Sequence, residues 1–393
     1  MMPSERSGFI FRRPELARQI ADGLTGGGLT DYRSGLFLAG PRRTGKSTFL
    51  REDLIPECES RGWYPVYVDL WADRKADPAD LISTAIADEL TRLEGRIRKL
   101  IKSSGVDKLS IFRTFSWDFS KPKLPEEVTL SQALEALHEA ADKLVVLIID
   151  EAQHAQTTDT GLNAMFALKS ARDHLTQGRD KDALRLVFTG SNRDKLAHLV
   201  LKKDQPFFGS SVTSFPFLGT DYVHAFTEWV NGKLAVGNQF SLQDMQDVFE
   251  MVGHRPEMLL KVVSEVSLNL GEAAHLGDLL RDGALYLRDG VWGEFESGYL
   301  SLTDLQKAVL EVMIDRASSR EPFSPFTEAT IQEVGRVLGE LGSDSQAGVP
   351  AVQGAMDALR EKDLIWRSSR GVYALEDQSI VDWFKHYRKS SRN

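Results

Sequence analysis

The chain has 393 residues, a net charge of −9, 42% hydrophobic and 9% aromatic residues. This length suffices for two or three domains, and the composition excludes a disordered, collagen-like or coiled-coil chain. A single cysteine, Cys58, excludes an internal disulfide and a cysteine-based zinc site, and the acidic charge excludes a protein that coats nucleic acid with its whole surface.

Apolar runs in the sequence are short. The longest uninterrupted aliphatic run, 144–149, is far below the roughly 20 residues of a membrane-spanning helix. The N-terminal segment carries Arg12 and Arg13 but lacks the apolar stretch of a signal peptide. We therefore expect a cytoplasmic protein with no membrane segment.

Strand-like and helix-like segments alternate over the first 217 residues. Helical spacing of apolar residues covers 78–100, and an aliphatic run such as 144–149 is typical of a parallel strand buried on both faces. The segments read as strands are 35–39, 64–70, 144–149 and 184–189. This alternation predicts an α/β fold with a parallel sheet and right-handed crossovers.

After Pro216 the strand signals stop, and 222–288 reads as a small helical domain. The last hundred residues predict three helices (303–316, 328–341 and 349–362) and then two short strands (364–367 and 371–375). Three helices closed by a β-hairpin are typical of a winged helix. We expect a P-loop NTPase core at 1–217, a helical lid at 218–292 and a winged-helix domain at 293–393.

The most specific motif is GPRRTGKS at 40–47, which matches the P-loop pattern G-x-x-x-x-G-K-[ST] between an apolar strand and a helix start. Its glycines let backbone N–H groups surround phosphate oxygens, and the helix N-terminus adds a positive dipole. We expect Lys46 to reach the β- and γ-phosphates, Ser47 to bind Mg²⁺ and Thr48 to contact the α-phosphate. The predicted cofactors are ATP and Mg²⁺, and the predicted nucleotide contacts are Gly40, Pro41, Arg42, Arg43, Thr44, Gly45, Lys46, Ser47 and Thr48.

A second motif, LVVLIIDE at 144–151, is a buried strand that ends in two acids. With a P-loop upstream, this pattern indicates a Walker B element. We expect Asp150 to hold the Mg²⁺ shell and Glu151 to orient and polarise the attacking water, with Lys46 as the third catalytic residue. The alternative for Glu151 is a solvated loop acid.

Polar residues follow the fourth predicted strand in the sequence TGSN at 189–192. A polar group there can sense the γ-phosphate, which nominates Thr189, Ser191 and Asn192. The alternative is turn chemistry, because Gly, Ser and Asn are common in turns.

Two arginine-containing segments are further candidates for nucleotide contacts. Arg255 precedes Pro256 at a helix start, where it either reports the nucleotide state or is simply a solvated residue at a helix with Pro in its first turn. The segment 9–16 (FIFRRPEL), with Arg12, Arg13 and Pro14, either contacts the base or begins a helix that packs on the core.

In this order the motifs resemble the AAA+ and STAND branch of P-loop ATPases, in particular the archaeal-type STAND ATPases, which are relatives of the origin-recognition ATPases. The resemblance rests on FRRPEL, GPRRTGKST, VDL, LIIDEAQ, FTGS, GHRPEML and DLIWRSSRGVYAL. It implies an ATPase core, a helical lid and a C-terminal winged helix. One departure concerns the arginine finger, because 206–212 (PFFGSSV) holds no arginine. Arg193, Lys202 and Lys203 are possible substitutes, and hydrolysis is expected to be slow.

Two basic regions are candidate partner surfaces. Residues 92–123 contain nine Lys/Arg against three Asp/Glu together with Phe112, Phe115, Trp117 and Phe119, a mixture that suits nucleic acid, although the alternation over 115–119 favours a half-buried strand. In the winged helix, the candidate DNA contacts are Arg367, Arg370, Lys385 and Arg388. Winged helices also contact proteins, so both partner types stay open.

The function expected from these features is an ATP-hydrolysing molecular switch that transmits its nucleotide state to double-stranded DNA through the winged helix. The alternative is a nucleotide-gated signalling or assembly scaffold, for example a defence or transposition regulator, that acts on a protein partner or on its own homo-oligomer with no DNA role.

Overall fold

The computed structural model describes residues 8–103, 123–177, 183–267, 276–369 and 371–390. The aromatic residues Phe112, Phe115, Trp117 and Phe119 lie outside these ranges, as does Arg370. The chain divides into two compact units. One comprises Arg13–Gly40 and Lys46–Phe215, and the other comprises Pro41–Gly45, Pro216–Asn393 and the N-terminal residues up to Arg12.

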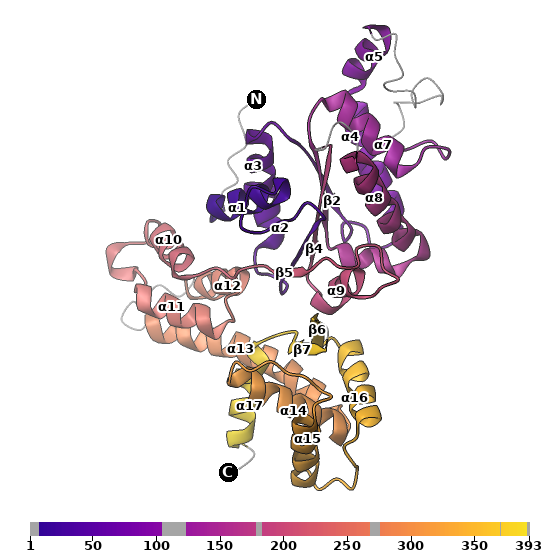
Figure 1. The fold of residues 1–393 in the computed structure, drawn as a ribbon. Coiled ribbons are helices and arrows are strands. Elements are labelled where there is room, and N and C mark those ends of the chain that lie inside the picture. The colour runs from indigo at the N-terminus through magenta and orange to yellow at the C-terminus, as the bar shows by residue number, and fades with distance from the viewer. Residues whose placement is uncertain (1–7, 104–122, 178–182, 268–275, 370, 391–393) are drawn as a thin grey trace. The chain divides into compact units, whose positions relative to one another are not determined.

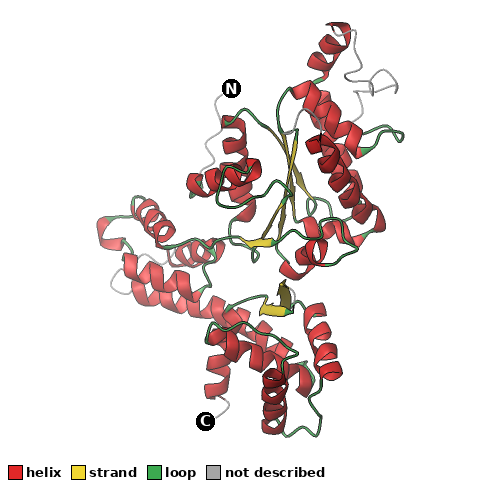
Figure 2. Ribbon diagram, in the orientation of Figure 1, coloured by secondary structure: helices red, strands yellow, loops and turns green. Residues whose placement is uncertain are grey.

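A parallel sheet of five strands, in the order β2-β3-β4-β1-β5, is the centre of the first unit (Figure 2). Its strands are β1 (Leu36–Ala39), β2 (Tyr64–Asp69), β3 (Val145–Asp150), β4 (Leu184–Gly190) and β5 (Val212–Ser214). Each neighbouring pair is parallel. The predicted α/β class is confirmed, and the four expected strands are present. The edge strand β5 was not expected, because three residues with no aliphatic run give little sequence signal.

Both faces of the sheet are buried by helices (Figure 1). Alternate residues point to opposite faces, so Leu36 and Leu38 pack on one side while Phe37 and Ala39 pack on the other. The helices on the first side are α1 (Pro14–Thr25), α2 (Lys46–Phe49) and α3 (Ile55–Ser60). Those on the second side are α4 (Pro78–Arg92), α5 (Glu94–Ser103), α7 (Leu130–Ala141), α8 (Asp159–Gln177) and α9 (Arg193–Leu201).

Two helices depart from the regular pattern that their sequences predict. The expected helix at 78–100 is interrupted at Leu93, where φ and ψ leave the helical region between α4 and α5. After the P-loop, a π-helical turn, η1 (Leu50–Leu54), separates α2 from α3. Such turns are rare within helices and are frequent at functional sites.

The second unit begins with a helical region that has its own aromatic core. Tyr222 and Phe226 of α10 pack with Phe249 of α11, and Phe9 of the N-terminal segment joins them, with its ring centroid 5.3 Å from that of Phe226. The elements are α10 (Thr220–Asn231), η3 (Val236–Asn238), α11 (Leu242–Met251), α12 (Pro256–Ser267) and α13 (Leu276–Leu300). Phe9 and Phe11 therefore serve in packing.

The C-terminal part of this unit is a helical bundle closed by an antiparallel hairpin that resembles a winged helix. It contains α14 (Asp304–Ser318), α15 (Glu328–Glu340), α16 (Val349–Glu361), β6 (Ile365–Ser369), β7 (Val372–Leu375) and α17 (Ser379–Ser390). Helix α17 was not anticipated. Helix α13 is continuous through residues 292 and 293, where the sequence suggested a domain boundary. None of the described helices combines the length and apolar character needed to cross a membrane.

Candidate nucleotide-binding site

The P-loop leaves β1 at Ala39 and enters α2 at Lys46. Gly45 has φ +88° and Arg43 has φ +66°, so the loop turns through left-handed backbone that glycine tolerates and arginine adopts at a cost. The Thr44 hydroxyl closes the turn by donating to the Pro41 carbonyl at 2.8 Å. A Cβ on Gly40 would lie 3.0 Å from that of Phe215, so glycine is needed there for close packing.

Lys46 and Ser47 occupy the first turn of α2, where backbone N–H groups face outward from the helix. The Lys46 side chain is buried, and its Nζ donates to the Gly40 carbonyl at 2.6 Å. This bond holds the ammonium group against the start of the loop. Thr48 and Arg42 are exposed.

Asp150 ends β3 and is fully buried. Three donors reach its carboxylate: the Thr189 hydroxyl and the Glu151 N–H (3.1 Å) donate to Oδ1, and the Tyr67 hydroxyl donates to Oδ2 at 2.9 Å. Thr189 comes from β4, the strand next to β3, and Tyr67 comes from β2 on the other side. The carboxylate orientation is therefore fixed by both neighbouring strands.

Glu151 follows with φ +55°, a left-handed conformation that turns the chain sharply after β3. Its Oε2 accepts hydrogen bonds from Gln153 Nε2 (2.5 Å), Ser191 Oγ (2.7 Å) and Ser191 N (3.1 Å). Gln153 Oε1 is buried without a hydrogen-bond partner and lies against Gly190, where a Cβ would come within 2.6 Å. Gly190 thus leaves room for the side chain that holds Glu151.

The three residues proposed as sensors lie near one another but form hydrogen bonds with different partners. Thr189 binds Asp150, Ser191 binds Glu151, and Asn192 caps α9 by accepting from the Lys195 N–H at 2.8 Å. Arg193, a candidate finger, is 8% exposed in the first turn of α9, whereas Lys202 and Lys203 are exposed.

Two residues that sequence reasoning missed complete this region. Arg51, in the π-helical turn, donates to the Tyr67 hydroxyl at 3.1 Å and lies 3.7 Å from Asp69. Burial raises the pKa of Asp69, and the neighbouring Asp150 carboxylate adds to the rise. Burial, with the charge of Asp150, also raises the pKa of Tyr67, so its phenol stays a hydrogen-bond donor. For Tyr67, the available sequence signal was the strand-like segment VYVDL, which ends beside β3.

The N-terminal arginines and Arg255 have structural partners. The Arg13 N–H donates to Asp53 Oδ1 at 2.9 Å, its guanidinium lies 4.9 Å from the Phe215 ring centroid, and Pro14 begins α1. Arg12 is exposed. Arg255 precedes α12 and forms an ion pair with Asp377, which also accepts from the N–H and hydroxyl of Ser379 at the start of α17. Nucleotide contact by these arginines stays a prediction.

The basic residues nominated for DNA differ in their surroundings. Arg388 binds Glu311 and Asp315 at 2.9 Å each, and Lys385 lies 3.8 Å from Asp382 on the exposed face of α17. Arg367 is half-buried in β6. Much of the positive charge of α17 is thus balanced within the unit.

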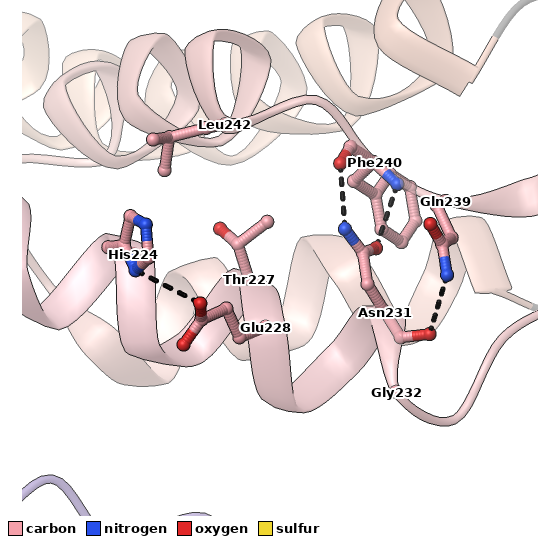
Figure 3. Close-up of a pocket in the computed structure, with 8 residues that line it drawn as sticks. All are labelled: His224, Thr227, Glu228, Asn231, Gly232, Gln239, Phe240 and Leu242. Atoms are coloured by element: carbon pink, nitrogen blue, oxygen red, sulfur yellow. Dashed lines mark hydrogen bonds and ion pairs between the residues drawn. The ribbon is translucent and has the colours of Figure 1, made fainter. Parts of the chain in front are cut away.

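A separate pocket lies between α10 and α11 and contains none of the predicted site residues (Figure 3). The Asn231 side chain bonds the Phe240 backbone on both its oxygen and its nitrogen, and Gln239 donates to the Asn231 carbonyl at 3.2 Å. These amides anchor the loop between the helices.

The residues that begin α2 and the acid that ends β3 fit a magnesium nucleotide. Mg²⁺ binds oxygen ligands, usually one or two protein groups together with phosphate oxygens and waters. Ser47 supplies a hydroxyl and Asp150 a carboxylate that is already held by three donors, while Lys46 supplies a positive charge at the start of the same helix.

Comparisons with known proteins agree with this architecture. Residues 30–198 match the family model described as an AAA domain. The fold is similar to that of the Walker-type ATPase PABY2304 of Pyrococcus abyssi, with 18% identity, a TM-score of 0.54 and coverage of 96% of each chain. It is also similar to the ADP form of the Aeropyrum pernix ORC2 protein, with 13% identity, a TM-score of 0.54 and coverage of 100% of this chain and 96% of the other. No curated relative matches the sequence. Residues 30–198 therefore form an AAA domain of the P-loop ATPase class.

Proposed function

We propose that the protein is a Mg²⁺-dependent ATPase that acts as a nucleotide-controlled switch. The observation that carries this proposal is the joint placement of the Asp150 and Glu151 carboxylates in hydrogen bonds with Thr189 and Ser191, beside the strand that leads into Lys46. Ends of parallel strands are the usual binding edge of an α/β sheet.

Each residue has a distinct task in this proposal. Mg²⁺, when bound with ATP, neutralises phosphate charge. Lys46 balances charge on the phosphates, and Ser47 and Asp150 orient the metal shell. Glu151 orients the attacking water and accepts its proton. All three described donors to Glu151 reach Oε2, so we assign Oε1 to the water.

Two variants test the hydrolytic part. Lys46→Ala should abolish ATP binding, because it removes the charge that holds the phosphates. Glu151→Gln should bind ATP as the wild type does and fail to release phosphate. Tight ATP binding by Lys46→Ala would refute the P-loop assignment, and wild-type turnover by Glu151→Gln would remove Glu151 as the base.

We further propose that the winged helix transmits the nucleotide state to double-stranded DNA. The test is fluorescence anisotropy of labelled duplex DNA with Glu151→Gln, in ATP and in ADP, at two salt concentrations. Phosphate contacts predict binding that weakens steeply with salt, and a switch predicts that it depends on the nucleotide.

The second candidate function is a scaffold that acts on a protein partner or on a second copy of the chain. It is favoured by the charge balance of α17, where Arg388 is bound to two carboxylates. An absence of DNA binding in both nucleotide states would support this candidate, and nucleotide-dependent oligomerisation measured by light scattering would then test it.

A further inference from the structure

We infer that Tyr67 is a positioning residue for the magnesium site, and that it acts by fixing the Asp150 carboxylate while Arg51 holds its hydroxyl in place. This inference rests on the proposed function and extends it to two residues outside the Walker motifs. The chain of contacts runs from the helix that follows the P-loop, through β2, to the end of β3.

The first step is the geometry of Asp150. The Thr189 hydroxyl and the Glu151 N–H both donate to Oδ1. Rotation of the carboxylate about its Cβ–Cγ bond therefore depends on the hydrogen bond made at Oδ2. Tyr67 supplies the donor there, at 2.9 Å. Its phenol is therefore the described contact that fixes the plane of the carboxylate.

The second step is the support of Tyr67 itself. Arg51 donates to the phenol oxygen at 3.1 Å, and its guanidinium carbon lies 4.9 Å from the ring centroid. The Tyr67 oxygen therefore accepts a hydrogen bond from Arg51, and its single proton is donated to Asp150. Arg51 also lies 3.7 Å from Asp69, the residue paired with Asp150 in the β2–β3 register.

The third step is the π-helical turn. Arg51 lies in η1, five residues after Lys46 and four after Ser47. The helical segment that begins with Lys46 and Ser47 also carries Arg51, which bonds the Tyr67 hydroxyl, so both oxygen ligands proposed for Mg²⁺ are connected to this segment.

Groups that orient a metal-associated carboxylate typically affect metal affinity by about 10- to 100-fold. The variant Tyr67→Phe removes the donor and keeps the ring. The matched control is Tyr64→Phe on the same strand, whose hydroxyl donates to Glu89 at 2.8 Å on the opposite face of the sheet from Tyr67.

The experiment measures binding of a fluorescent ATP analogue to the full chain, first in EDTA and then over a titration of Mg²⁺. For Tyr67→Phe we expect unchanged affinity in EDTA and about a tenfold higher Mg²⁺ concentration at half-maximal enhancement. Arg51→Gln should shift the midpoint in the same direction by less, and Tyr64→Phe should match the wild type.

A Mg²⁺ midpoint for Tyr67→Phe equal to that of the wild type overturns the inference, as does an equal shift in Tyr64→Phe, which would indicate a general effect of strand β2. Loss of affinity in EDTA would also overturn it, because Tyr67 would then act on the nucleotide or the fold. A wild-type protein that binds no nucleotide refutes the proposed function itself, which separates the two failures.

Discussion

The packing of Gly190 against Gln153 gives a prediction that needs no ligand. A Cβ at position 190 would lie 2.6 Å from Gln153 Oε1 and 3.3 Å from Leu196 Cβ and Cδ2. Gly190 ends β4 without a positive φ, so alanine is compatible with its backbone and the cost is steric. Overpacking of this kind costs about 1–3 kcal/mol. Because the closest atom is the end of a side chain, we expect about 1–2 kcal/mol for Gly190→Ala.

The same contact predicts how the cost changes when Gln153 is shortened. In Gln153→Ala the amide is absent, and the Cβ of alanine at 190 keeps only the milder contacts with Leu196 at 3.3 Å. Gly190→Ala should then cost close to zero, because alanine also lowers the entropy of the unfolded chain. The coupling between the two substitutions should therefore be about 1 kcal/mol or more.

Equilibrium denaturation of the wild type, both single variants and the double variant measures this coupling. Gly95→Ala is the control, because nothing lies within 4 Å of a Cβ at Gly95 in α5. An equal cost for Gly190→Ala with and without the Gln153 amide would refute the reasoning. Since Gln153 holds Glu151, Gly190→Ala and Gln153→Ala should also change phosphate release by similar factors.

Three other predictions concern Arg255, Cys58 and Arg388. Asp377→Asn keeps an oxygen for the Ser379 cap but removes the charge that holds Arg255. Because a partly exposed ion pair contributes roughly 1 kcal/mol, a nucleotide-binding Arg255 released in this way should raise ATP affinity about fivefold in a titration. An unchanged affinity would argue against that role. Cys58 is buried and burial raises its pKa to about 12, so alkylation of the native protein at pH 8 should be negligible by mass spectrometry, and rapid labelling without denaturant would contradict its burial. Arg388→Gln should lower the free energy of unfolding by about 1 kcal/mol and leave any duplex affinity unchanged, whereas a weaker complex with unaltered stability would make Arg388 a DNA contact.

The fold class could be predicted because its signals are local. An aliphatic run such as 144–149 indicates a strand that is buried on both faces. The glycines and the lysine of the P-loop lie within eight consecutive residues because they surround the same phosphate groups. The three helices and hairpin at the C-terminus were predictable for the same reason. Strand β5 was missed because its three residues are only partly buried or exposed, so it is defined by pairing with β1 rather than by an aliphatic run.

The partners of the predicted site residues could not be predicted, because they depend on register and not on spacing. Tyr67 reaches Asp150 only because β2 pairs with β3 so that Asp69 is opposite Asp150. Arg51 reaches Tyr67 from a π-helical turn, and no sequence pattern predicted that turn. A shift of one residue in register would turn Tyr67 to the other face of the sheet and break this contact.

This difference has a consequence for how the site would tolerate change. The P-loop residues contact the nucleotide in the proposed function, so their loss should be visible in any assay of binding. The Tyr67 hydroxyl and the Gln153 amide, neither of which is a predicted ligand contact, hold the carboxylates of Asp150 and Glu151. Their substitution leaves every predicted ligand contact in place and changes only the orientation of two acids. Binding in EDTA should therefore survive while metal dependence and turnover change, and this separation is what distinguishes a positioning network from a binding surface.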